Sequence, residues 1–221
     1  MNQEWSQLQK NMQSQIKKKV TFEEGINTLL ELREKLFEEI CSFRNEVQRE
    51  EFDAIPFLNA NGYHSKTIAY SLWHTFRIED IVAHSLMNGD DQIFFLGNYQ
   101  KRIQAPIITT GNELFKEEIA DFSKQLNIEE LYQYITEVKD STNEALKCLT
   151  YADLARKMTG IDKENLQKLK VVSGDERAYW LIDYWCGKDV RGFLQMPFSR
   201  HWIMHVEASL RIKNKIHPDT L

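Results

Sequence analysis

The sequence predicts an all-α protein, and three observations indicate this class. Apolar residues recur at spacings of three and four over long segments, which is the period of an amphipathic helix. Several Thr, Ser and Asn residues are followed three positions later by Glu, a pattern that marks helix starts. No stretch alternates apolar and polar residues for long enough to indicate a sheet. The long segments together favour a helical bundle with extra short helices in the connections.

The length of 221 residues favours one domain, which we place at 21–216 after an N-terminal polar segment at 1–20. The net charge is −5, and the only basic run, Lys17–Lys19, is too short to indicate a nucleic-acid-binding arm. No apolar window is long enough for a membrane span, and the N-terminus has no secretory h-region. We therefore expect a cytoplasmic protein that acts on neither nucleic acid nor membrane.

The three cysteines agree with that compartment. Cys41, Cys148 and Cys186 lie far apart in the chain, are odd in number and form no C-x-x-C pair. We expect all three to be reduced and none to bind a metal.

Two long helices are expected in the first part of the chain. The first begins at Thr21, which can form a capping box with Glu24, and it runs to about Glu50. Its apolar stripe consists of Ile26, Leu29, Leu30, Leu36, Ile40, Phe43 and Val47. The second runs from about Tyr63 to Met87 and is ended by Asn88–Gly89. We expect the first helix to pack antiparallel to the second and to serve as scaffold that contributes no ligand, since it has no histidine.

The connections predict shorter elements. The segment 90–108 looks irregular, and a capping box at Thr110 indicates a short helix to about Gln125. Asn127 with Glu130 then opens a third long helix. Short helical turns are expected at 150–160 and 162–169, and an aromatic helical segment follows at 173–187.

The start of the last helix stays open between two positions. Asp189 is a good N-cap, whereas Pro197 fits the first turn of a helix and would kink one that began earlier. In both cases the helix contains His201 and should end near His217–Pro218.

His201 and His205 are the main candidates for function. Their i, i+4 spacing places both imidazoles on one uncharged face of the last helix, one turn apart. An inward imidazole has few partners, and a divalent metal is one of the best. The residues between the two histidines do not include the glutamate of the H-E-x-x-H protease motif. Two histidines do not make a site, so a third ligand must come from elsewhere.

The second helix offers that third histidine. His74 shares its face with uncharged residues, whereas His84 lies among Lys66, Arg77 and Asp80. We therefore expect His74 to point inward and His84 to lie at the surface. His74 can be a metal ligand or a core histidine bonded to a carbonyl or hydroxyl. As ligands, His74, His201 and His205 are enough to hold Zn²⁺, Ni²⁺ or Fe²⁺ and leave open coordination positions.

The chain also resembles a known family. A long first helix, a Leu72-Trp73-His74 turn on the second helix and Arg200-His201-Trp202-Ile203-Met204-His205 on the last are similar to the DinB-like superfamily of four-helix-bundle metalloproteins. This resemblance covers about 21–216 and implies a three-His metal site formed by His74, His201 and His205. It also implies that a small thiol can be activated at the metal, because some members are thiol-dependent transferases or isomerases.

Two features depart from the family pattern. Many members have Arg-Gly-Gln after the second histidine of the pair, where this chain has Val206-Glu207-Ala208. The segment 88–125 is also longer than a minimal member needs. Both departures concern function more than fold.

Two functions are expected from these patterns. The first is a metal-dependent enzyme, a thiol transferase or hydrolase, in which the cation generates a thiol or water nucleophile for a small-molecule substrate. The second is a non-catalytic metal- or ligand-binding stress-response protein. Residues near the site could include Tyr70, Arg77, Trp202 and Glu207. Trp180, Tyr184 and Trp185 could line a pocket mouth, form a contact in a homodimer or belong to the core.

Overall fold

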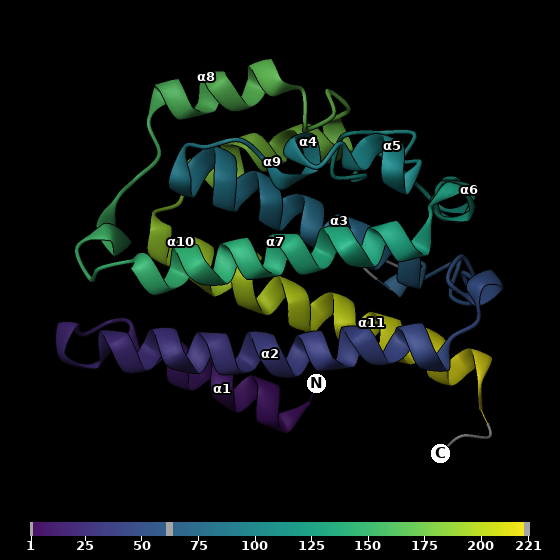
Figure 1. Cartoon of the computed structure of the whole chain (residues 1–221), viewed down its shortest axis with the longest axis horizontal. Helices are drawn as coiled ribbons and strands as arrows, with labels where there is room; N and C mark the ends of the chain where they lie inside the picture. The colour runs from purple at the N-terminus through teal and green to yellow at the C-terminus, as the bar shows by residue number, and fades with distance from the viewer. Residues whose placement is uncertain (1, 61–63, 219–221) are drawn as a thin grey trace.

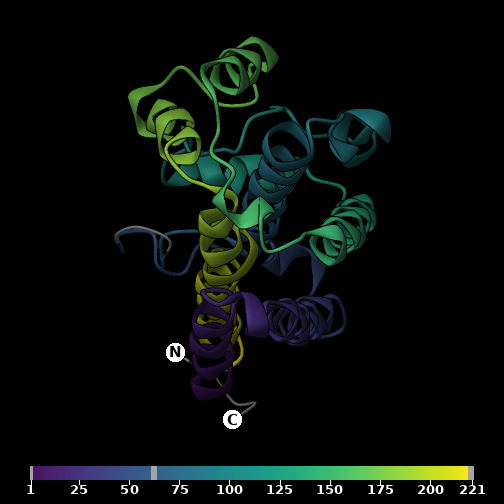
Figure 2. The ribbon, with the colours of Figure 1, turned by 90° about the vertical axis from the view of Figure 1, so that its left-hand side faces the viewer.

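The computed structural model describes residues 2–60 and 64–218, and these contain helices but no strand. Four long helices pack side by side: α2 (Phe22–Glu46), α3 (Ile68–Asp80), α7 (Ile128–Cys148) and α11 (His201–Ile216). Seen end-on in Figure 2, they form a ring in the order α2, α11, α3, α7. The all-α prediction is confirmed for this part of the chain.

The helix α2 runs opposite to α3, as expected, but lies diagonally across the ring from it (Figures 1 and 2). Its direct neighbours in the ring are α7 and α11. The predicted apolar stripe faces the core, because Leu29, Leu36 and Phe43 have no exposed surface. Burial of this stripe fixes the rotation of α2 about its own axis.

The ends of α2 differ from the prediction. The helix begins at Phe22, but Thr21 donates its hydroxyl to the carbonyl of Gln15 at 2.7 Å and forms no side-chain cap. The helix ends at Glu46 rather than Glu50, and the short 3₁₀ segment η2 (Arg49–Glu51) follows.

A helix that the sequence analysis did not identify precedes α2. This helix, α1 (Gln3–Gln15), packs along α2 and buries Trp5 and Met12. The two helices approach so closely that a Cβ added to Gly25 would meet Ile16 Cγ2 at 2.6 Å. With so few apolar positions, α1 depends on packing against α2 rather than on a strong stripe of its own.

The helix α3 starts at Ile68, where the Thr67 hydroxyl accepts from the Tyr70 amide at 3.0 Å. The predicted start at Tyr63 lies outside the described residues. The helix continues as the π-helical segment η4 (Ile81–Asn88) and ends at Gly89, whose φ of 75° is in the left-handed region that glycine favours. The predicted end of this helix is therefore confirmed.

The described connections contain further short helices. Within the segment expected to be irregular, the chain forms α4 (Ile93–Leu96) and α5 (Tyr99–Ile103). The helix α6 (Glu117–Gln125) starts seven residues after Thr110, whose hydroxyl bonds to Asn112 instead of capping a helix. Next come η5 (Asp153–Ala155), α8 (Gly160–Leu169) and α9 (Glu176–Cys186).

The start of the last helix combines both predicted positions. Asp189 caps α10 (Val190–Gln195) by accepting from the Gly192 amide at 2.8 Å. Pro197 then lies in the π-helical segment η6 (Met196–Arg200), which leads directly into α11. A proline cannot donate a backbone hydrogen bond, so the widened turn occurs where that bond is missing.

The described cysteines are free: Cys148 is exposed, and Cys41 and Cys186 are half-buried. None of the described helices is both long and apolar enough to cross a membrane.

Candidate metal centre

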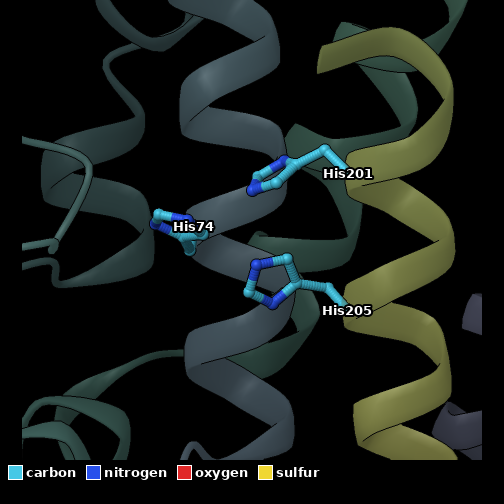
Figure 3. Close-up of side chains that lie close together, drawn as sticks. All are labelled: His74, His201 and His205. Atoms are coloured by element: carbon cyan, nitrogen blue, oxygen red, sulfur yellow. The ribbon is translucent and has the colours of Figure 1, made fainter. Parts of the chain in front are cut away.

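The structure brings His74, His201 and His205 together. His74 lies in the middle of α3, and His201 and His205 lie on consecutive turns of α11 (Figure 3). The ring centroids are 5.1 Å apart for His74 and His201, 4.9 Å for His74 and His205, and 4.6 Å for the helix pair. One ring nitrogen of each histidine lies within 4.8 Å of the other two.

Burial makes the three imidazoles neutral. Their exposed fractions are 6%, 7% and 5% for His74, His201 and His205. Loss of hydration lowers the pKa of His74 to about 4, against a smaller opposing effect of its hydrogen bond to Thr110. The same loss lowers the pKa values of His201 and His205 well below their usual value, and the neighbouring imidazoles lower them further. A neutral imidazole is the form that binds a metal.

A backbone hydrogen bond fixes the tautomer of His74. Its Nδ1 lies 2.8 Å from the carbonyl oxygen of Thr110, which can only accept, so Nδ1 carries the proton. The lone pair is therefore on Nε2. Bonds of this kind orient metal-ligating histidines and increase their basicity. The ring of Tyr70 stacks on His74 with centroids 5.4 Å apart, which further restricts the imidazole.

The donor set fits a divalent cation. A tetrahedral Zn²⁺ with bonds of about 2.0–2.1 Å needs ligand nitrogens close to one another. The three imidazole nitrogens meet this requirement, since they all lie within 4.8 Å of one another. No other cluster of three metal-ligating side chains occurs among the described residues. Three ligands would leave at least one coordination position for water or substrate.

The three histidines line a cavity of about 440 Å³. The side chains of Trp180, Tyr184 and Trp185 on α9 line the same space. Trp180 is 51% exposed, whereas Trp185 is buried. Trp185 therefore belongs to the hydrophobic core as well as to the cavity wall, so two of the alternatives left open by the sequence apply to it.

The prediction that His84 lies at the surface is wrong. His84 is 3% exposed, its Nδ1 donates to Asp90 at 2.7 Å, and its Nε2 lies 3.2 Å from the Ser141 hydroxyl. The prediction relied on Arg77 and Asp80 as markers of a solvent-facing side. These two residues instead form a fully buried ion pair of 3.1 Å, and every residue of α3 is buried.

The four candidate neighbours of the site have different environments. Tyr70 packs directly on His74, as described above. Arg77 pairs with Asp80 and donates to the carbonyl of Ile108 at 2.8 Å, so it is held by other partners. Glu207 accepts from the backbone amide of Asn2 at 2.6 Å.

Trp202 anchors α11 beside the histidines. Its indole N–H donates to Glu79 Oε2 at 2.6 Å, and Arg33 forms a bidentate pair with the same carboxylate at 2.9 and 2.7 Å. Arg33 and Glu79 have no exposed side-chain surface, and the guanidinium lies 4.4 Å from the Trp202 ring centroid. This contact joins α2, α3 and α11 and fixes the rotation of α11 that directs His201 and His205 inward.

Sequence reasoning missed three residues of the site. Thr110 acts through its backbone carbonyl, which leaves no signal in the residue type. Asn112 lines the cavity from a loop that no periodic pattern describes. Lys66 was assigned to the second helix on the side of His84, but it precedes the start of α3 and lines the cavity.

No family model matches the sequence, and no curated protein is significantly similar to it.

Proposed function

We propose that His74, His201 and His205 bind one divalent cation and that the protein uses it to activate a thiol or water nucleophile for transfer to a small-molecule substrate. Zn²⁺ and Ni²⁺ are the preferred cations and Fe²⁺ the alternative, because imidazole suits all three. The bound cation would lower the pKa of a coordinated thiol or water towards neutrality.

The observation that carries this proposal is that the three ligands face a cavity. Structural zinc sites close around the metal with four protein ligands, whereas catalytic sites keep a position open. Here three neutral imidazoles line one side of a space of about 440 Å³, which suits a small molecule. The aromatic residues of α9 would limit the access of water to a bound nucleophile.

We further propose that the chain is a member of the DinB-like type of four-helix bundle. The ring of α2, α11, α3 and α7 supports this, as does a site with one histidine on the second long helix and an i, i+4 pair on the last. A low-molecular-weight thiol is the co-substrate that this assignment suggests.

The test is thiol-dependent turnover. Zn²⁺- and Ni²⁺-loaded protein would be incubated with a small thiol and an electrophile such as 1-chloro-2,4-dinitrobenzene, and formation of the thioether would be followed by absorbance. We expect the rate above the uncatalysed reaction to disappear in metal-free protein and in His205→Ala. A rate that is the same with and without metal would contradict a metal-activated nucleophile.

The second candidate is a non-catalytic metal- or ligand-binding stress-response protein. One observation favours it: among the described residues that line the cavity, none carries a carboxylate that could act as a general base. A protein that binds metal stoichiometrically and shows no turnover with thiols or with activated esters would have this function.

A further inference from the structure

A second cavity adjoins the metal-site cavity. It has a volume of about 490 Å³ and shares two lining residues, Lys66 and Asn112, with the cavity of the three histidines. These two side chains therefore stand where the two spaces meet. Any molecule that enters the metal-site cavity from this side passes them.

The lining of the two neighbouring cavities is cationic, although the chain is acidic. Lys66, Lys116 and Arg177 line the two spaces, and none of the described lining residues is Asp or Glu. The whole chain has a net charge of −5, so the positive charge of the cavity lining is opposite in sign to the net charge of the chain. Arg177 is already neutralised by a bidentate pair with Asp175, at 2.9 Å for each bond.

Lys66 differs from Arg177 because no carboxylate among the described residues pairs with it. Its ammonium lies 4.8 Å from the centroid of the Tyr70 ring, the ring that also stacks on His74. Burial lowers the pKa of Lys66 to about 8, and no described acidic group opposes this effect. A ligand with an anionic group would stabilise such a partly buried cation, because it would supply the missing partner.

Asn112 offers a second donor at the same place. Its Oδ1 accepts from the Thr110 hydroxyl at 2.7 Å, which leaves the Nδ2 amide group for another partner. The backbone carbonyl of Thr110 holds His74 at the same time. One short turn thus positions both a metal ligand and a hydrogen-bond donor beside Lys66.

We propose that this site binds a small organic acid whose carboxylate pairs with Lys66 and Asn112 and whose apolar body lies against Trp180 and Tyr184. This inference deepens the proposed function, because it names the class of molecule that reaches the metal. Aromatic side chains of α9 supply the apolar contact area, and the ammonium supplies the charge that selects an acid over a neutral analogue.

The test compares two probes of the same shape, 2-naphthoate and 2-naphthamide, by isothermal titration calorimetry. Both are titrated into metal-free and Zn²⁺-loaded protein. The variants are Lys66→Met and the control Lys101→Met, which removes an exposed lysine that lines neither cavity. We expect the acid to bind at least about tenfold more tightly than the amide in the parent and in Lys101→Met, equivalent to about 1.4 kcal/mol. In metal-free Lys66→Met this preference should vanish, while binding of the amide stays the same.

Three results would overturn the proposal: equal affinities of the parent for the acid and the amide, a preference for the acid that survives in metal-free Lys66→Met, or failure of both probes to bind. The metal-free titration separates this inference from the proposed function. If the protein binds no metal but prefers the acid through Lys66, the anion site stands and the metal site fails. If the protein binds metal but does not distinguish the acid from the amide, the metal site stands and the anion site fails.

Discussion

His74 and Thr110 are joined by a hydrogen bond of 2.8 Å between the ring Nδ1 and the backbone carbonyl oxygen. The bond links the middle of α3 to the loop that precedes α6, and it directs Nε2 as the ligand atom. We predict that His74 has the Nδ1–H tautomer in metal-free protein and keeps it when Zn²⁺ binds. Long-range ¹⁵N–¹H NMR of the imidazole measures this. A dominant Nε2–H tautomer in the metal-free protein would contradict the assigned role of Thr110.

The buried histidines should make the metal-free protein sensitive to acid. Histidine in an unfolded chain titrates near pH ~6.5, whereas the pKa of folded His74 is about 4. Between these two pH values the unfolded chain binds more protons than the folded chain. The contribution of His74 to stability is therefore fully present above about pH 6.5 and is lost as the pH falls towards 4. His74 alone should remove roughly 2 kcal/mol between about pH 7.5 and pH 5.

Urea unfolding of the metal-free protein at both pH values measures that loss. His74→Gln should reduce the pH dependence. Equal slopes in the parent and His74→Gln would show that His74 is not buried in its neutral form.

The Arg33–Glu79 pair should be costly to break. Both side chains are fully buried, and the carboxylate also accepts from the Trp202 indole. Glu79→Gln leaves the guanidinium without a counter-charge, so we expect a loss of about 3–5 kcal/mol in the free energy of unfolding. The double variant Arg33→Met with Glu79→Gln should lose less than the sum of the single losses. Lys147→Met removes an exposed pair with Glu144 and should cost less than about 1 kcal/mol. A loss in Glu79→Gln as small as this control would mean that the pair is solvated.

Leu36 tests the assignment of the α2 core stripe. It has no exposed surface and lies in the main apolar cluster, so Leu36→Ala should cost about 2–5 kcal/mol without changing metal binding. Leu96, which is 67% exposed, is the matched control, and its replacement by Ala should cost less than about 0.5 kcal/mol. Similar losses in both variants would show that the stripe is misassigned.

The features that the sequence predicted correctly depend on local patterns. The stripe of α2, the cap of α7 at Asn127 and the end at Gly89 each follow from residues a few positions apart. The i, i+4 spacing of His201 and His205 likewise needs only helix geometry, and the uncharged face of His74 indicated an inward position.

The features that the sequence did not predict depend on how helices and loops pack together in three dimensions. A helical wheel shows which residues share a face but not whether a charge on that face is paired, and Arg77 and Asp80 pair in the interior. His84 was therefore placed at the surface by mistake. The Thr110 carbonyl reaches the site from a loop, where no periodicity predicts the direction of a group. Lys66 was placed on the predicted second helix, but α3 begins only at Ile68.

The direct test of the metal site is calorimetric titration of metal-stripped protein with Zn²⁺, confirmed by elemental analysis. The account predicts one Zn²⁺ per chain in the parent and in the control His217→Gln. It predicts a loss of at least about a hundredfold in affinity in His74→Ala, His201→Ala and His205→Ala, since each variant leaves only two imidazoles. Circular dichroism would check that each variant keeps its helical content. Parent-like stoichiometry and affinity in all three variants would contradict the account.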